Sequence, residues 1–441
     1  MYQIDAPAVY AHESVMSNPK YRARAESVVR SLKPPCEIIT YRDEDLPGLI
    51  KDGGILRRRI AMGTLDKVDD PILLFNTFRF DGEKEHAARI EVLKAKGLEP
   101  DTYPQSLLGV GAFRWACYNL KDDPAREDKV CRPCWRIHFE EGCLHKCKYC
   151  GLGGLLVSMV NVEDYCAQLS KIIEKHPWQR TYLIDDDADP PCLEPELGCL
   201  GEIIEFFGTL KDRYLIIHTK TWNTAWMRNL KHNGNTIIVW SLSGPTQSRL
   251  IEPNTGTTEE RIEAARVAEE AGYQIRYKFK PIIPVRNWRE EASKTIELAF
   301  DKTHPDIISM CVFMWMDVNE MKRRLAPVLD LLDPECLKAA EEGQAEMAET
   351  RTKPFPEKMR AMIYDHYATE IRKRNASIPI SLSTENWRMW RRFGKRLGMT
   401  ATNYVCACGP MATPGAGKLS KHPFKSAVRV EVDVSDTGAE H

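Results

Sequence analysis

The sequence lacks the marks of a membrane protein and of a strongly charged one. No apolar run approaches the roughly 20 residues that a helix needs to cross a bilayer. The 441 residues carry a formal net charge of −1, so the chain as a whole is not attracted to nucleic acid or anionic lipid. No basic segment precedes an apolar stretch near the N-terminus, so we predict no signal peptide and a cytoplasmic location. We find no internal repeat. These absences argue against membrane insertion. Any contact with nucleic acid would depend on a local patch of positive charge.

Cysteine, in contrast, is abundant. Fourteen cysteines are more than packing requires, and in a reducing compartment such clusters indicate metal ligands or catalytic thiols before disulfides. The stretch GCLHKCKYCG holds Cys143, Cys147 and Cys150 in the spacing C-x3-C-x2-C. Three thiolates on a loop after a strand can bind three irons of a four-iron, four-sulfur (4Fe–4S) cluster and leave the fourth iron open for a ligand. The alternative is a zinc site with His138 or His145 as fourth ligand, but such sites more often pair two C-x2-C units.

The middle of the chain alternates short β-rich runs with helical stretches, which is typical of βα units and a parallel sheet. The predicted strands cover 135–140, 181–185, 214–220, 236–243, 273–283 and 306–316. The predicted amphipathic helices between them cover 162–176, 200–211, 258–272 and 288–302. The third helix has Thr257 and Thr258 at its start and Gly272 at its end, which are favourable caps.

These elements predict an α/β fold, a partial (β/α)6 barrel of parallel strands with N-terminal and C-terminal α-rich extensions. We expect residues 1–130 to pack on a barrel core of 131–320, followed by a C-terminal helical region and tail over 321–441. The first extension contains a strand-like stretch at 72–80. The last contains 387–398, which interleaves aromatic and cationic residues. We favour an amphipathic helix packed on the barrel there over a nucleic-acid contact.

The cysteine spacing, with Tyr149 just before the third cysteine, resembles the radical S-adenosylmethionine superfamily. A longer stretch, 230–288, resembles the spore photoproduct lyase branch of that superfamily. The residues that carry this second resemblance are His232-Asn233-Gly234, Glu252-Pro253, Thr255, Arg261, Ala264-Ala265, Ala271-Gly272-Tyr273, Pro281-Ile282 and Trp288. The resemblance extends from about 135 to 290, so both ends of the chain lie outside it.

The resemblance implies a 4Fe–4S cluster on the three cysteines and S-adenosylmethionine at its open iron. It places Tyr149, Lys220 and Ser241 beside that cofactor. A cation suits the cofactor's carboxylate, and a hydroxyl suits its ribose or carboxylate oxygens. Asp185, Asp186 or Asp187, in the acidic stretch DDDAD, is expected to receive the methionyl ammonium, although an acidic turn explains that stretch equally well. An electron donor such as flavodoxin or ferredoxin is implied as a partner.

Two positions depart from the family pattern. Spore photoproduct lyases carry a hydrogen-donating cysteine after the second strand, where this chain has residues near Asp186. They also carry a tyrosine after the third cluster cysteine, where this chain has Gly151. We therefore predict hydrogen abstraction from a different substrate, small and anionic rather than nucleic acid. The alternatives are DNA repair with a rearranged hydrogen donor and a zinc-stabilised nucleic-acid-binding protein without catalysis.

Four further cysteines form two pairs, Cys131 with Cys134 and Cys406 with Cys408. Together they could form a second metal site. Alternatively, Cys406 and Cys408 could reach the active site as a redox or hydrogen-donor pair.

Three cations alternate along the predicted strand 273–283, namely Arg276, Lys278 and Lys280. Alternate residues of a strand share one face, and burying three charges there would be costly. We therefore predict that this face lines a polar cavity that binds an anionic substrate.

Overall fold

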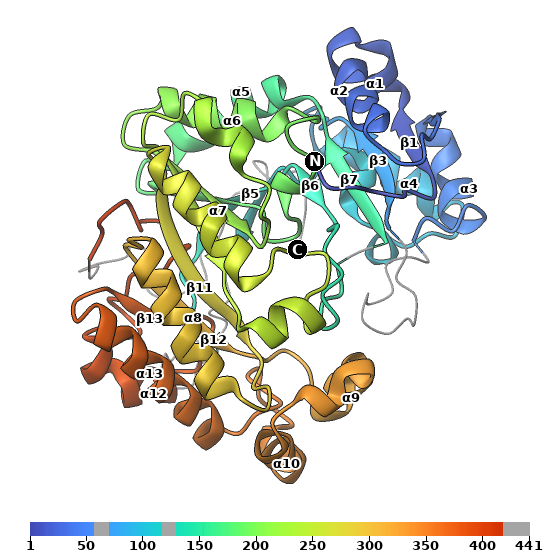
Figure 1. The fold of residues 1–441 in the computed structure, drawn as a ribbon. Coiled ribbons are helices and arrows are strands. Elements are labelled where there is room, and N and C mark those ends of the chain that lie inside the picture. Colours follow the sequence, from blue (N-terminus) through green and yellow to red (C-terminus); the bar gives the residue numbers. More distant parts are fainter. Residues whose placement is uncertain (57–69, 117–128, 153, 418–441) are drawn as a thin grey trace.

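The computed structural model describes residues 1–56, 70–116, 129–152 and 154–417, which form two large sheets, a two-stranded sheet and their helices. The first sheet has five strands in the order β2-β1-β3-β7-β6, and all of its pairings are parallel except β6 with β7. Its strands are β1 (Val9–His12), β2 (Ile38–Tyr41), β3 (Ile72–Asn76), β6 (Glu140–Glu141) and β7 (Leu155–Met159). Every residue of β3 and β7 is buried, as expected for parallel strands covered on both faces. Figure 1 shows this sheet with α1–α4 as a lobe beside the second sheet.

The second sheet has six parallel strands in the order β13-β12-β11-β10-β9-β8, which confirms the predicted partial barrel. The strands are β8 (Thr181–Ile184), β9 (Tyr214–Thr219), β10 (Thr236–Ser241), β11 (Gln274–Ile282), β12 (Ile308–Val312) and β13 (Ile380–Leu382). One predicted member was wrong. The stretch 135–140 does not supply a strand of this sheet within the described residues, because β5 (Cys134–Ile137) pairs antiparallel with β4 (Phe113–Ala116). The sixth strand is β13, from the C-terminal region.

The described residues form thirteen α-helices, of which α5, α6, α7 and α8 are the four predicted at 162–176, 200–211, 258–272 and 288–302. They are α1 (Glu13–Ser17), α2 (Pro19–Arg30), α3 (Leu46–Lys51), α4 (Glu83–Lys94), α5 (Val162–Lys175), α6 (Cys199–Thr209), α7 (Thr258–Glu270), α8 (Trp288–Lys302), α9 (Val318–Arg324), α10 (Pro334–Glu342), α11 (Gln344–Met347), α12 (Glu357–Arg374) and α13 (Trp387–Leu397). Helix α7 begins with a capping box between Thr257 and Glu260, and Gly272 follows it with φ +91°. Among the described residues, no helix combines the length and the apolar character that a bilayer crossing requires.

The domain boundaries at 131 and 320 stay predictions, and two strand pairings join residues from opposite sides of a boundary. Strand β7 follows the cysteine loop and pairs with β3 of the N-terminal sheet. Strand β13 comes from beyond 320 and pairs with β12 of the half-barrel. The cysteine loop itself lies within the first sheet, between β6 and β7, and helix α5 leads from β7 to β8 of the second sheet.

Helix α13 packs its aromatic side against the fold. Trp390 and Phe393 are buried and Trp387 is half-buried, whereas Arg391 and Arg392 are exposed. The packing interpretation of this helix is confirmed.

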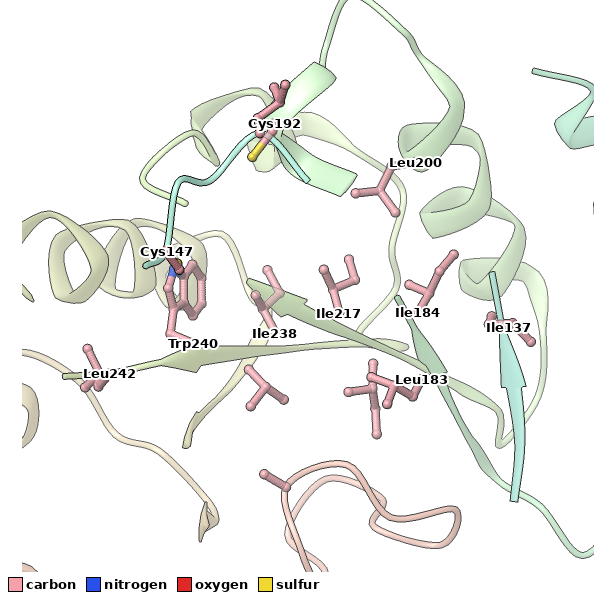
Figure 2. Packing of buried hydrophobic residues seen from close by; sticks show 14 of the residues in the cluster. Ile137, Cys147, Leu183, Ile184, Cys192, Leu200, Ile217, Ile238, Trp240 and Leu242 are labelled. Atoms are coloured by element: carbon pink, nitrogen blue, oxygen red, sulfur yellow. The ribbon is translucent and has the colours of Figure 1, made fainter. Parts of the chain in front are cut away.

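Side-chain alternation divides the six-stranded sheet into two faces. In Figure 2, Ile184, Ile217 and Ile238 point to the side where Leu200 of α6 lies, and Leu183 points to the other side. Following the strand register from Leu183, the second face carries residues such as Lys278. We call this second face the inner face, because it is the one that α6 does not cover.

A C-terminal segment, 404–413, lies across the inner face. The N–H of Ala407 donates to Ser309 Oγ of β12 at 3.0 Å, and Arg276 Nη1 of β11 donates to the carbonyl of Ala407 at 3.2 Å. At the other edge of the sheet, the N–H of Thr181 donates to the carbonyl of Pro410 at 3.0 Å. The segment therefore spans the half-barrel from β12 to β8.

Candidate active site

The three-cysteine loop lies between β6 and β7 and is fixed to the segment that follows β10. The N–H groups of Lys146 and Lys148 donate to the carbonyls of Pro253 and Ile251, each at 2.9 Å. Parallel strands bring their carboxyl ends to one edge of a sheet, which is where half-barrel active sites form. The loop is thereby held near the carboxyl ends of β9 and β10.

The three thiols lie close enough to influence one another. Burial raises the pKa of the Cys143 thiol, and Asp189, Cys150 and Cys147 raise it further. The N–H of His145 donates to Cys143 Sγ and that of Leu152 donates to Cys150 Sγ, both at 3.4 Å. A bound metal requires deprotonated thiols, and backbone N–H donors stabilise thiolate sulfur. The donor set therefore fits an iron–sulfur cluster.

The two histidines considered as zinc ligands have other contacts. His138 Nδ1 contacts Asp185, and the His145 ring lies between Asp189 at 3.3 Å and Cys192 at 3.3 Å. His145, Asp189 and Cys192 bring their donor atoms within 4.8 Å of one another. Both histidine rings contact residues other than the three clustered cysteines. This weakens the interpretation of that cluster as a zinc site with a histidine ligand.

A buried carboxylate, Glu252, lies beneath the loop and joins it to the barrel. Its Oε1 accepts a hydrogen bond from the Tyr149 hydroxyl at 2.6 Å and contacts Lys220 Nζ at 3.0 Å. Its Oε2 accepts from Ser243 Oγ at 2.9 Å and from Arg261 Nη2 at 2.8 Å. The carboxylate thus connects the cysteine loop, the ends of β9 and β10, and helix α7.

The charges of this network stabilise one another. Burial alone would raise the pKa of Glu252, but Lys220 and Arg261 hold it well below its usual range. Burial alone would lower the pKa of Lys220, but Glu252 beside it raises that pKa above its ordinary value. Lys220 also contacts the Tyr149 hydroxyl. Glu252 is therefore an anion and Lys220 a cation at neutral pH.

The acidic stretch after β8 is engaged with its own chain. Asp185 is fully buried and contacts His138 through one oxygen, while its other oxygen accepts from the N–H groups of Phe139 and Glu140 at 3.1 and 3.2 Å. Asp186 forms an ion pair with Arg136. These contacts brace the start of the cysteine loop, and a role of either aspartate toward a cofactor stays a prediction.

Asp189, in the same stretch, was not singled out from the sequence. It accepts from Thr219 Oγ1 at 2.7 Å and from the N–H of Lys220 at 2.8 Å. Burial raises the pKa of Asp189 to about 6.

The remaining predicted site residues lie on the inner face. Ser241 is half-buried at the end of β10, beside Lys278 in the strand register. Arg276 is fully buried and paired with Asp306 at 2.7 Å, so its charge is already balanced within the chain. Lys278 Nζ donates to Cys408 Sγ at 3.5 Å, and Lys280 Nζ donates to Ser383 Oγ at 3.4 Å.

Contacts between their segments bring the cysteine pairs Cys131–Cys134 and Cys406–Cys408 near each other. Arg132, between Cys131 and Cys134, donates through Nη2 to the carbonyl of Tyr404 at 3.0 Å and stacks on its ring at 4.6 Å. The hydrogen bond with Cys408 and burial raise the pKa of Cys406 well above its usual value, and Cys131 adds a smaller effect in the same direction. No three of these sulfurs lie as close together as the 4.8 Å His145 group within the described residues. A second metal site there stays a prediction.

Sequence reasoning missed the centre of the network. Glu252 and Arg261 had been noted as matching residues without a role. The signal that could have found them was the Glu252-Pro253 pair after a strand end, followed by an arginine on the next predicted helix.

Part of the chain is similar in sequence to known proteins. The family model described as spore photoproduct lyase matches residues 130–316, less than half of the chain. A spore photoproduct lyase of Clostridium acetobutylicum is 27% identical over 183 residues, 40% of this chain and 54% of that protein. That of Bacillus subtilis (strain 168) is 29% identical over 163 residues, 35% of this chain and 48% of the relative. The chain thus matches about half the length of these curated relatives.

Solved structures extend the likeness of the fold. A spore photoproduct lyase complexed with dinucleoside spore photoproduct has a TM-score of 0.56 at 14% identity, covering 86% of this chain and 99% of that one. A mutant with bound AdoMet and the same dinucleoside gives the same TM-score and coverage. The fold resembles that of these spore photoproduct lyase structures. Over residues 130–316 the sequence is also similar to the spore photoproduct lyase family. The ligand in those two related structures is a dinucleoside.

Proposed function

We propose that this chain is a radical S-adenosylmethionine enzyme that abstracts hydrogen from an anionic, nucleotide-bearing substrate. The observation that carries the proposal is the three-thiol loop fixed above the Glu252–Lys220 network, inside the segment that matches the family model. When bound, a reduced 4Fe–4S cluster supplies the electron that cleaves S-adenosylmethionine to the 5′-deoxyadenosyl radical. A flavodoxin or ferredoxin as electron donor and a cytoplasmic location stay predictions.

The other roles in the proposed site fall to side chains of this chain. Cys143, Cys147 and Cys150 would hold the cluster. The Lys220 ammonium has three N–H groups, and its contacts with Tyr149 and Glu252 use two, so one can donate to the cofactor's carboxylate. Tyr149 fixes the direction of that ammonium.

Ser241 supplies a hydroxyl on the inner face for the cofactor's ribose or carboxylate. Asp185 and Asp186 act chiefly by bracing the loop, with Asp186 kept as a candidate partner for the cofactor's ammonium. Arg276 is not part of the proposed substrate site, because its guanidinium N–H groups donate to Asp306 and to two backbone carbonyls.

Two features support an anionic substrate and a thiol hydrogen donor. Lys278 and Lys280 lie on the inner face, where they supply positive charge. The Cys406–Cys408 pair lies on the same face beside Lys278, and it is the candidate hydrogen donor in place of the thiol absent near Asp186.

The proposal is tested with anaerobically purified protein. Wild type should be brown, contain about four irons per chain, and release 5′-deoxyadenosine from S-adenosylmethionine on reduction. Cys143→Ala should lose the colour and that activity. Cys336→Ala, a buried cysteine at the start of α10, should keep both. Colourless wild-type protein with stoichiometric zinc would contradict the proposal.

A small anionic molecule is the second candidate substrate. It is favoured by the missing thiol near Asp186 and by Gly151 in place of the family's tyrosine. DNA affinity that falls with salt, with S-adenosylmethionine recycled, would favour repair. Cofactor consumption without DNA affinity would favour the small molecule.

A further inference from the structure

Trp315 is an exposed indole in a conformation that costs free energy. It lies three residues beyond Val312, the last residue of β12, and 41% of it is exposed. Its φ of +86° is in the left-handed region, which residues other than glycine rarely adopt. Backbone strain of this kind concentrates at ligand and active sites. An apolar ring held in solvent by a strained backbone needs a reason beyond folding.

A cation lies against this ring. Lys280 Nζ, from the inner face of β11, is 5.1 Å from the centroid of the indole. Burial lowers the pKa of Lys280, and the neighbouring Lys278 lowers it further. Two cations on one strand face repel each other, so an anion bound between them would relieve that repulsion. The site therefore offers both an aromatic surface and a place for negative charge.

An aromatic chain links this site to the cysteine loop. The rings of Trp315 and Phe313 are 6.4 Å apart, and those of Phe313 and Tyr149 are 6.0 Å apart with an edge-on geometry. Tyr149 is the residue that hydrogen-bonds Glu252 beneath the loop. A ligand on Trp315 would thus be one aromatic residue away from the residues assigned to the cofactor.

We propose that Trp315 and Lys280 form the substrate-recognition element of the site, with the indole stacking on a nucleobase and the ammonium binding the adjacent phosphate. This assignment rests on the proposed function and specifies which residues read its substrate. Aromatic stacking tolerates any base, and a lysine binds phosphate as a point charge.

The test is equilibrium dialysis of the anaerobic holoenzyme with thymidylyl-thymidine, a dinucleotide with one phosphate, and with thymidine. Trp315→Ala should weaken binding of the dinucleotide roughly tenfold, and Trp315→Phe should restore part of it. Lys280→Met should weaken the dinucleotide about tenfold and leave thymidine unchanged. Trp222→Ala is the matched control, because Trp222 is 47% exposed but contacts Tyr2 instead.

The outcomes separate this inference from the proposed function. Iron content and 5′-deoxyadenosine release without substrate report on the proposed function alone. If these are normal and Trp315→Ala binds the dinucleotide as wild type does, the recognition element is wrong. Equal loss in Trp222→Ala, or no binding by wild type, would also overturn it. Missing iron with Trp315-dependent binding would instead overturn the proposed function.

Discussion

Glu252 is the residue on which the site's electrostatics depend. Its two oxygens face Lys220 and Arg261, and all three side chains are at most slightly exposed. Removing one partner of a buried ion pair leaves an uncompensated charge, which costs far more than the pair itself contributes. The carboxylate is therefore a structural requirement of the cysteine loop as well as an electrostatic one.

Glu252→Gln should lower the free energy of unfolding by about 3 kcal/mol, because two buried cations lose their anion. It should also reduce the iron retained by the cysteine loop. Urea denaturation and iron analysis measure the two effects. Glu259→Gln removes an exposed partner of Arg249 and should change stability by less than about 0.5 kcal/mol. Similar stability of the two variants would refute the role given to Glu252.

Cys408 should react as a thiolate at unusually low pH. The hydrogen bond with Cys406 lowers the pKa of Cys408 well below its usual range; burial opposes this, while Lys278 and His218 add to it. Because the lowered pKa keeps the thiolate populated, alkylation of Cys408 by iodoacetamide should change little between about pH 8 and 6, where an ordinary thiol slows roughly 100-fold.

Mass spectrometry of the peptide that contains Cys408 measures this rate. Lys278→Met should raise the thiol pKa and restore a steep fall of the rate with falling pH. Lys278→Arg keeps the cation and should keep the flat profile. A steep profile in wild type would show that the thiol is not stabilised as proposed.

At the scale of elements, the apolar periodicity predicted those strands and helices that the local sequence determines. Five of the six half-barrel strands and the helices α5, α6, α7 and α8 were predicted, because each has its own apolar pattern. Strand β13 was not, since Ile380–Leu382 is three residues long and gains its pairing only from β12. The stretch 135–140 has a strand pattern, but β4 takes its β5 portion as an antiparallel partner. Pairing between distant segments is what the pattern leaves open.

Helix α13 gives a test of packing against nucleic-acid binding. Trp390 is 1% exposed and its ring lies 4.6 Å from that of Tyr404, so Trp390→Ala should cost about 3–5 kcal/mol of stability. Arg391→Ala, on the exposed side, should change stability by less than about 0.5 kcal/mol. Denaturation curves check both values. A marked loss of DNA affinity in Arg391→Ala, with stability unchanged, would favour the nucleic-acid interpretation.

At the scale of the whole molecule, the site could be predicted only in part. Cys143, Cys147, Cys150, Tyr149, Lys220 and Ser241 could be proposed as site residues because a local motif or a strand end marks them. The contact between Lys278 and Cys408 joins residues 130 positions apart, and no local pattern predicts it. The pairing of Arg276 was not predicted for the same reason, since its partner Asp306 and the segment 404–413 come from elsewhere in the chain.

The cysteine loop lies between two strands of the first sheet and is hydrogen-bonded to the segment that follows β10 of the second, which predicts that the two sheets unfold together. Strand β7 follows the loop directly and pairs with β3, and the N–H of Tyr2 donates to the carbonyl of Cys192 at 3.1 Å. Leu156→Ala, within β7 and 3% exposed in wild type, should cost about 2–5 kcal/mol. Circular dichroism and the visible absorbance of the bound cluster should lose signal at one denaturant midpoint, shifted equally by the variant. If the variant lowered the circular dichroism midpoint and left the cluster absorbance unchanged, the N-terminal sheet would be an independent unit and the loop would be held by the half-barrel alone.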